Sequence, residues 1–451
     1  MSFVSDRSLI AVQESAHPLS GSREDYDPDY DPLIELIGNA RYVLLGEATH
    51  GTHEFYKARA ELTQRLVAEK NFTVLAWEAD WPDALRVNRY IRKTGQDADA
   101  EESLRGFQRF PTWMWRNADV LDLIGWLRKH NSRLPALASK AGVYGLDLYS
   151  LHASMNAVIR YLEKTDPEAA KEARIRYSCF EYFGDHPQAY GLTASQHHSL
   201  SCEDEVVKQL VELQRHASDY LSRDGRMAAD ELFFAEQNAR VAKSAEQYYR
   251  AMYHGRPNTW NLRDTHMVDT LDNLIQHLEH QGERPKAIVW AHNSHLGDAR
   301  ATQMGERGEL NVGQLMRERH GSETVLVGFT TYTGTVTAAS DWGGAAECKR
   351  VRPGMEDSYE RLLHDAGLPK FLLVIRGDRD LMDQLKPVHL ERAIGVIYRP
   401  ETERWSHYFE ASLSQQFDAV IHFDETRAVE PLERTADWEE GELPDTYPSG
   451  V

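Results

Sequence analysis

Cysteine is scarce in this chain, with 3 among 451 residues and no C-x-x-C pair. So few thiols fit neither a disulfide framework nor a thiolate zinc site, and a reducing compartment is the simpler expectation. No apolar run approaches the roughly 18 residues that a membrane helix needs, and the first residues lack a signal-peptide pattern. These absences predict a cytoplasmic protein without a membrane partner.

Positive charge is also in short supply. The 51 lysine and arginine residues face 71 acidic residues, which gives a formal net charge of −20. A surface of that sign repels phosphate backbones, so nucleic acid is not expected as a partner.

Several catalytic and cofactor-binding motifs are missing as well. The sequence has no G-x-S-x-G elbow, no P-loop, and no G-x-G-x-x-G after its first apolar run. These absences favour a water activated by histidine over a serine nucleophile, and they predict no cofactor.

Apolar runs of strand length recur along the chain and alternate with helical patterns in its first part. They lie at residues 42–45, 74–77, 143–146, 287–290, 325–329, 371–375, 394–398 and 419–423. Nearly continuous apolar runs are typical of strands covered on both faces, and strand, helix, strand succession indicates a parallel sheet. We therefore expect an α/β fold with a mostly parallel central sheet flanked by helices.

The domain organisation follows from changes in composition. Residues 1–32 are polar and rich in Asp, Pro, Ser and Tyr, which predicts an irregular N-terminal arm. Residues 33–427 carry the α/β pattern, with a helical insertion at about 150–285 where strand signals fade. Residues 428–451 read as an acidic, solvated tail.

The first apolar run ends in the turn G-E-A-T-H-G at residues 46–51. Its glycines let the chain bend, so Glu47 and His50 can both point into the crevice beyond the strand ends, with His50 as a general base. The alternative is a structural turn, in which His50 caps the following helix and Glu47 binds its backbone amides.

Further acids and an arginine are expected at the same edge of the sheet. Glu78 ends the second run and Asp147 the third, although Asp147 fits a helix cap better. Arg59 falls on the apolar helix stripe of Phe55, Leu62 and Leu66, where an inward guanidinium must find a carboxylate, either Glu47 or Glu78. Alternatively, Arg59 lies at the stripe edge and reaches water.

His292 and His295 follow the run at residues 287–290 and are three positions apart. On a helical turn both rings would share one face, where they could stabilise an oxyanion or bind a metal. A purely structural role for both histidines remains open. No metal is predicted, because no tight motif such as H-E-x-x-H occurs.

Aromatic residues concentrate near Phe110, Trp113 and Trp115. They could line a pocket for a bulky, apolar substrate, or they could be core packing. Arg263 and Asp264 begin a helical pattern and are expected to brace the histidine segment rather than to act in catalysis.

Taken in order, these segments resemble the erythromycin esterase family. The resemblance rests on the turn at residues 46–51, Trp77-Glu78, the R-D-x-x-M stretch at 263–267, A-H-N-S-H at 291–295, and the motifs at 398–404 and 406–409. It covers roughly residues 33–424 and implies an α/β core with added helices. It also implies hydrolytic opening of a macrolide lactone, with His50 as the base and with Glu47, Arg59, Glu78, His292 and His295 around it.

We therefore predict a cytoplasmic carboxylic-ester hydrolase that acts on a small-molecule ester or lactone, with antibiotic resistance as an implied role. Two alternatives stay open. One is a metal-dependent hydrolase that uses the same Glu and His cluster as ligands, and the other is a protein that binds a small apolar molecule without turning it over. The sequence leaves the oligomeric state unknown.

Overall fold

The computed structural model describes residues 6–21, 28–135, 138–183, 187–196, 201–221, 225–253 and 256–440. The chain divides into two compact units. The first comprises Met1–Leu75, Arg89–Gly142 and Lys286–Val451, and the second comprises Ala76–Asn88 and Val143–Pro285. Within the described ranges, no helix combines the length and apolar content that a membrane crossing requires.

The first unit is built on a sheet whose centre is parallel. Its strands follow the order β1-β8-β11-β6-β2-β5, and β7 pairs with β6. β2 (Tyr42–Leu45) lies parallel between β5 (Ala287–Trp290) and β6 (Thr324–Ala338), and β6 also pairs in parallel with β11 (Ala419–Thr426). Three strands are antiparallel to their neighbours: β1 (Ala16–Pro18), β8 (Lys370–Val374) and β7 (Glu347–Val351).

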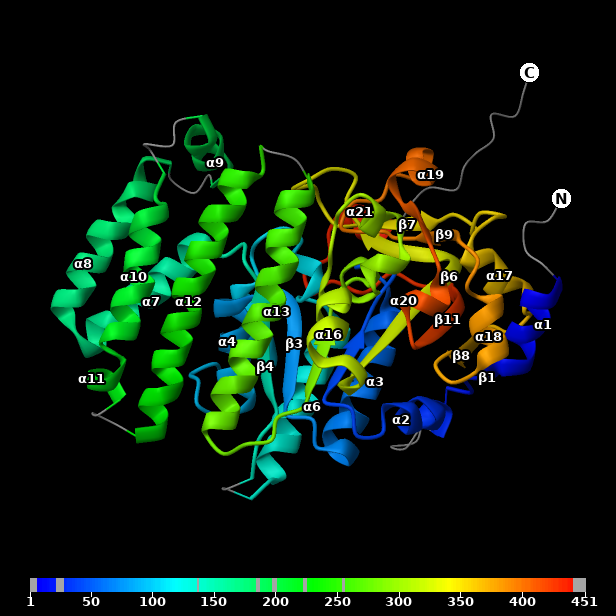
Figure 1. The fold of residues 1–451 in the computed structure, drawn as a ribbon, viewed down its shortest axis with the longest axis horizontal. Helices are drawn as coiled ribbons and strands as arrows, with labels where there is room; N and C mark the ends of the chain where they lie inside the picture. The colour runs from blue at the N-terminus through cyan, green and yellow to red at the C-terminus, as the bar shows by residue number, and fades with distance from the viewer. Residues whose placement is uncertain are drawn as a thin grey trace. The chain divides into compact units, whose positions relative to one another are not determined.

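Every residue of β2 and β5 is buried, as their uninterrupted apolar runs predict for strands covered on both faces. On α3 (His53–Lys70), Phe55, Arg59, Leu62 and Leu66 are buried along one helical stripe. The expected α/β fold with a central sheet and flanking helices is confirmed (Figure 1).

The other helices of the first unit are mostly short. They are α1 (Asp6–Ser15), α2 (Asp31–Ile37), α5 (Ala100–Ser103), α6 (Ala118–Arg133), α14 (Asn293–Leu296), α15 (Gln303–Glu306), α16 (Val312–His320), α17 (Tyr359–Asp365), α18 (Arg379–Gln384), α19 (Glu403–Ser406), α20 (Leu413–Gln416) and α21 (Ala436–Glu440). A separate antiparallel pair joins β9 (His389–Arg392) to β10 (Tyr408–Ala411).

The second unit contains two neighbouring strands and a set of helices. β3 (Val74–Asp80) and β4 (Gly142–Asp147) each cross a boundary between the units along the chain, as does α4 (Trp81–Ile91). The helices that follow β4 are α7 (Leu151–Thr165), α8 (Pro167–Tyr177), α9 (Pro187–Gln196), α10 (Glu203–Arg215), α11 (Ala217–Leu221), α12 (Gly225–Ala251) and α13 (Arg256–His280).

These helices share one apolar core. On α7, Leu151, Met155, Val158 and Leu162 are buried at the three- and four-residue spacing of a helical stripe. α12 packs against both α7 and α10, and Figure 1 shows these helices in cyan and green. Helices therefore make up most of the described part of residues 150–285, while residues 184–186, 197–200, 222–224 and 254–255 lie outside it.

The N-terminal segment is more regular than its composition suggests. The sequence predicts an irregular arm over residues 1–32, whereas residues 6–18 form α1 and β1. α1 buries Ser8, Ala11 and Val12, which are spaced as one face of a helix. Because these residues are small and their neighbours are polar, the hydrophobic pattern of the segment is weak. Residues 1–5 and 22–27 lie outside the described ranges, as do residues 441–451 of the expected tail.

The apolar run at residues 394–398 does not form the predicted strand. It makes isolated bridges instead, from Ile394 to Thr49 and from Ile397 to Ala339. Because the run contacts two different loops, it has no single strand with which to build a ladder. One of these bridges holds the turn that carries His50, through the His50 N–H bond to the Ile394 carbonyl at 3.3 Å.

The cysteine prediction was wrong in one respect. Cys179, in the 3-10 helix η4 (Ser178–Phe183), is bonded to Cys202, which directly precedes α10. Packing of the helices brings the two thiols together, and Cys202 belongs to their apolar core. Because disulfides are typical of oxidising compartments, the cytoplasmic location expected from the sequence stays a prediction.

This pairing predicts a measurable change on reduction. Alkylation of the denatured, unreduced protein should modify only Cys348, the free thiol. Opening a link between residues 23 positions apart should lower the free energy of unfolding by about 3 kcal/mol, because the unfolded chain gains freedom. Urea unfolding with and without reductant measures the change, and Cys348→Ser should leave it intact. Three alkylated cysteines in the unreduced protein would contradict the pairing.

Candidate active site

A buried glutamate holds His50 in one orientation. Glu47 Oε1 accepts a hydrogen bond from His50 Nδ1 at 2.9 Å, and the His50 side chain is only 9% exposed. Since a carboxylate only accepts, the proton of the neutral ring lies on Nδ1, and Nε2 keeps its lone pair. Tyr56 Oη donates a hydrogen bond to the His50 carbonyl at 2.9 Å and so holds the turn to α3. The pair has the arrangement of a general base with its orienting acid.

Arg59 supplies the second partner of Glu47. Its Nη2 lies 2.5 Å from Glu47 Oε2, and both side chains are almost fully buried. The guanidinium also lies over the rings of Tyr56 and Trp290, 4.6 Å from each ring centroid. Nε and Nη1 are buried and make no hydrogen bond within the described part of the chain, and the contact with the two rings is a favourable one for a cation. Of the two carboxylates that the sequence offered to Arg59, Glu47 is therefore the one it contacts.

Both glycines of the turn are required by close contacts. A Cβ on Gly46 would lie 2.2 Å from Asn293 Oδ1, and a Cβ on Gly51 would lie 1.8 Å from the Thr337 carbonyl oxygen. Asn293 Nδ2 donates to the Phe329 carbonyl at 2.8 Å, and the Asn293 N–H donates to the Glu47 carbonyl at 2.8 Å. Asn293 thus joins the ends of β2 and β5 to the interior of β6, a role that sequence reasoning missed because an asparagine in a turn is unremarkable by itself.

His292 and His295 lie on the one-turn helix α14 and its N-cap. His292 Nδ1 accepts from the Ser294 N–H at 3.2 Å, so its Nε2 carries the proton and donates to the Ala48 carbonyl at 3.1 Å. The His292 and His50 rings are 4.9 Å apart between centroids. His295 is buried in the same turn. The structure therefore groups Glu47, His50, Arg59 and His292 in the first unit.

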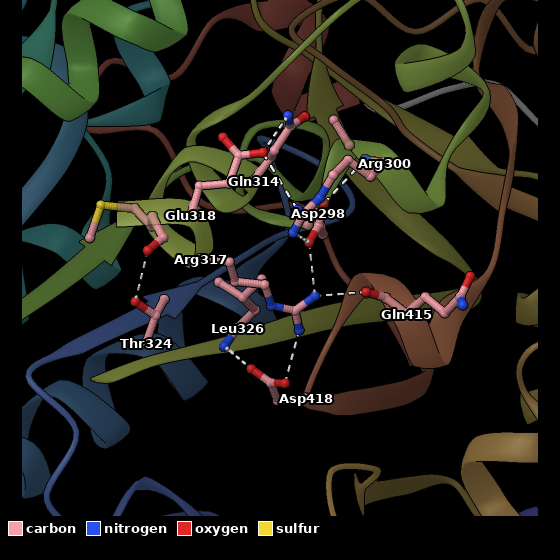
Figure 2. Close-up of polar contacts among 12 residues, drawn as sticks. Asp298, Arg300, Gln314, Arg317, Glu318, Thr324, Leu326, Gln415 and Asp418 are labelled. Carbon is pink, nitrogen blue, oxygen red and sulfur yellow. Dashed lines mark hydrogen bonds and ion pairs between the residues drawn. The ribbon is translucent and has the colours of Figure 1, made fainter. Parts of the chain in front are cut away.

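Asp298, which follows the turn that carries His292 and His295, anchors that turn to the sheet. Figure 2 shows Arg317 between two carboxylates, with Nη1 3.2 Å from Asp298 Oδ2 and Nη2 2.9 Å from Asp418 Oδ1. Asp418 Oδ2 accepts the Leu326 N–H of β6 at 2.8 Å, and Arg300 donates to both oxygens of Asp298. This network, which we call the Asp298 cluster, ties the end of the histidine turn to β6.

Asp298 should contribute stability that depends on pH. Burial opposes its charge, but Arg300 and Arg317 together lower the pKa of Asp298 below its usual value. Such a carboxyl stabilises the fold above its unfolded pKa of about 3.9 and loses that contribution as pH falls through the folded value. Asp298→Asn should lower the free energy of unfolding by about 2 kcal/mol at neutral pH, and the deficit should shrink below about pH 4.

Urea unfolding of both proteins across that pH range measures the effect. Asp341→Asn provides the control, because Asp341 also pairs with an arginine but its side chain is 76% exposed. A deficit that stays constant down to the lowest pH would contradict the assignment.

A second polar cluster lies in the second unit, at the ends of β3 and β4. Arg263 Nη2 is 2.6 Å from Glu78 Oε1, while its Nε and Nη2 hold Asp147 at 3.0 and 2.8 Å. Burial works against the cation, but the two carboxylates and Tyr149 raise the pKa of Arg263 above its ordinary value. Arg263, expected to brace the histidine segment, thus pairs with Glu78 and Asp147. The assignment of Glu78 to the same site as His50 stays a prediction.

The predicted aromatic pocket is only partly accessible. Trp113 and Trp115 are buried, and Trp115 packs against Phe107 at 6.2 Å between centroids. Phe110 contacts Trp113 at 5.4 Å and the exposed Trp342 at 5.0 Å. Burial favours core packing for the two tryptophans, whereas Phe110 and Trp342 form a surface on which an apolar group could rest.

The metal alternative lacks a donor set in the described part of the chain. There, no group of three or more His, Cys, Asp or Glu side chains is arranged to hold a metal ion. In the first unit, Glu47 is engaged by His50 and Arg59, and His292 by Ala48 and Ser294.

Comparison with known proteins gives consistent matches. The family model described as erythromycin esterase matches residues 67–426. Erythromycin esterase type II of Escherichia coli is 22% identical over 430 residues, which cover 90% of this chain and 94% of that protein. A solved succinoglycan biosynthesis protein aligns at a TM-score of 0.76 and 24% identity, covering 94% of this chain and 97% of that one. A solved erythromycin esterase mutant in its open conformation aligns at 0.65 and 18% identity, covering 88% and 93%.

Proposed function

Because the chain belongs to the erythromycin esterase family, we propose that it hydrolyses a carboxylic ester or macrolactone with a water activated by His50. The observation that carries this proposal is the 2.9 Å hydrogen bond between Glu47 and His50 Nδ1. It holds the ring by one nitrogen and leaves the other to accept a proton, as a general base requires.

In the proposed reaction, His50 Nε2 removes a proton from water while the oxygen attacks the carbonyl carbon. The C=O pair of electrons moves to the carbonyl oxygen, and the tetrahedral intermediate then expels the alkoxide. The proton held by His50 passes to that alkoxide, so one water yields one acid and one alcohol. Glu47 orients the ring and stabilises the imidazolium, and Arg59 supplies the positive charge that balances Glu47.

The two later histidines take different roles in this proposal. Both ring nitrogens of His292 are hydrogen-bonded, Nδ1 to the Ser294 backbone and Nε2 to the Ala48 carbonyl. His292 therefore positions the segment that carries Glu47 and His50. We assign stabilisation of the oxyanion to His295. Such a role is worth on the order of a hundred-fold in rate.

The names of the relatives make a macrolide lactone the first substrate to test, with resistance to such an antibiotic as the corresponding role. The full chain, incubated with a panel of macrolides and simple esters in ¹⁸O-labelled water, should yield a product that has gained one water with the label in its carboxyl group. Mass spectrometry detects both. Saturable binding without product across the panel would overturn hydrolysis in favour of a binding protein. Loss of activity on chelation, restored by a metal, would favour the metal-dependent alternative.

A further inference from the structure

The second unit contains a polar groove between α12 and α13, which we call the α12–α13 groove. Its cavity volume is about 650 Å³, within the range of small-molecule sites. α12 lines it with Arg240, Lys243 and Ser244, and α13 lines it at three- and four-residue spacing from residues 258 to 273. Arg263, which pairs with Glu78 and Asp147, is not among the lining residues. The groove is therefore distinct from the cluster at the strand ends.

Two cations in the groove differ from the buried arginines elsewhere in the protein. Arg59, Arg263 and Arg392 each lie within ion-pair distance of a carboxylate. Across the described ranges, neither Arg240 nor Lys243 has a carboxylate that close, and Arg240 Nε is buried without a hydrogen-bond partner. Although the chain has a net charge of −20, these two cations in one groove have no carboxylate nearby, so an anionic ligand would bind there favourably.

The surrounding charges do not cancel this preference. Asp269 is the acid that lines the groove, so the lining carries two cations against one carboxylate. Glu236 lies one turn before Arg240 on α12. Burial raises the pKa of Glu236, and the charge of Arg240, which lowers it, is the smaller effect. Burial and the charge of Arg240 lower the pKa of His266 to about 4, against the opposing charges of Asp147 and Asp269, so its ring is neutral near pH 7.

The rest of the lining suits a ligand with hydroxyl groups. His266 bonds Ser244 through Nδ1 at 3.0 Å, which orients that hydroxyl beside the cations. Side-chain amides add paired donors and acceptors around the groove; they belong to Gln247, Asn258, Asn261 and Asn273. A side-chain amide can donate hydrogen bonds to the hydroxyls of a polyol and accept hydrogen bonds from them.

We propose that the α12–α13 groove binds a small hydroxylated anion, a sugar phosphate or a sugar acid, through Arg240 and Lys243. The charged group of the ligand lies against the two cations, and its hydroxyls bond the amides and Ser244. This binding site does not depend on the proposed ester hydrolysis, since none of its lining residues takes part in that reaction.

Calorimetric titration of the full chain tests the proposal with four probes: glucose 6-phosphate, glucuronate, glucose and inorganic phosphate. At least one of the two anionic sugars should bind saturably and more tightly than both glucose and phosphate, and the better one identifies the charged group. Arg240→Gln combined with Lys243→Gln should weaken that binding by about tenfold or more for each cation removed.

A matched control removes the same two charges elsewhere in the unit. Arg215 and Lys208 lie on α10, more than half exposed and paired with neighbouring glutamates, and their double exchange to Gln should leave binding unchanged. If the double variant of the groove fails to fold, Lys243→Gln alone carries the test with an expected tenfold loss. Absence of saturable binding at millimolar concentrations, equal binding of glucose, or an equal loss in the α10 control would each overturn the proposal.

Discussion

Exchange of His50 for alanine should reduce ester hydrolysis by about a hundred-fold to ten-thousand-fold, the range that a positioned general base contributes. The loss should appear in kcat, because the ring acts on water in the transition state. Folding should persist, since the His50 ring makes a single side-chain hydrogen bond, to Glu47, within the described structure. Steady-state kinetics on a substrate identified from the macrolide and ester panel measure the effect, with circular dichroism as the check on folding.

His53→Ala serves as the matched control, because His53 lies three residues further on, at the start of α3. Its ring bonds Asp119 at 2.8 Å and Arg427 at 2.6 Å, and the proposed reaction does not use it. Its exchange should leave kcat within a few-fold of the original. Hydrolysis that survives in His50→Ala, or that falls equally in both variants, would remove His50 from the role of base.

Arg59→Met should cause the largest loss of stability, about 3–5 kcal/mol, because it leaves the Glu47 carboxylate buried without its cation. Methionine keeps part of the contact with Tyr56 and Trp290, so the loss reports mainly on charge. A second exchange, Glu47→Gln, should recover part of that stability, since it removes the unpaired charge. Urea unfolding followed by tryptophan fluorescence measures all three proteins.

Arg65 offers the control on the same helix. It is also buried, but its partners Asp31 and Glu69 are 40% and 37% exposed, so water can solvate them after the exchange. Arg65→Met should cost about 1 kcal/mol or less. If Arg59→Met costs no more than Arg65→Met, or if Glu47→Gln destabilises it further, the charge pair is not what holds the turn.

Much of the local structure was readable from the sequence. Continuous apolar runs predicted β2, β5 and the core of β6, and the spacing of Phe55, Arg59 and Leu62 predicted the buried face of α3. Both signals depend on neighbours along the chain, which periodicity records directly. The same signal failed for α1, whose buried face is made of small residues, and for residues 394–398, whose apolar run bridges two loops.

The sequence did not predict which charged residues pair with each other. The sequence required a carboxylate for Arg59 but could not choose between Glu47 and Glu78, because both follow apolar runs. The choice follows from which strands are neighbours, and the order β6-β2-β5 leaves no trace in the periodicity of any one strand. The Cys179–Cys202 bond and the pairing of Arg263 with Asp147 have the same origin, since each joins distant segments.

The sequence by itself determined the class of the fold, the positions of its buried runs, and the polar residues that follow them, because these depend on residue type and short-range spacing. The tertiary structure alone decided that Glu47 lies between His50 and Arg59, and that Arg240 and Lys243 line one groove without a carboxylate partner among the described residues. Which charges meet is set by how the elements pack, and packing joins residues whose separation in the chain carries no information about their distance in space.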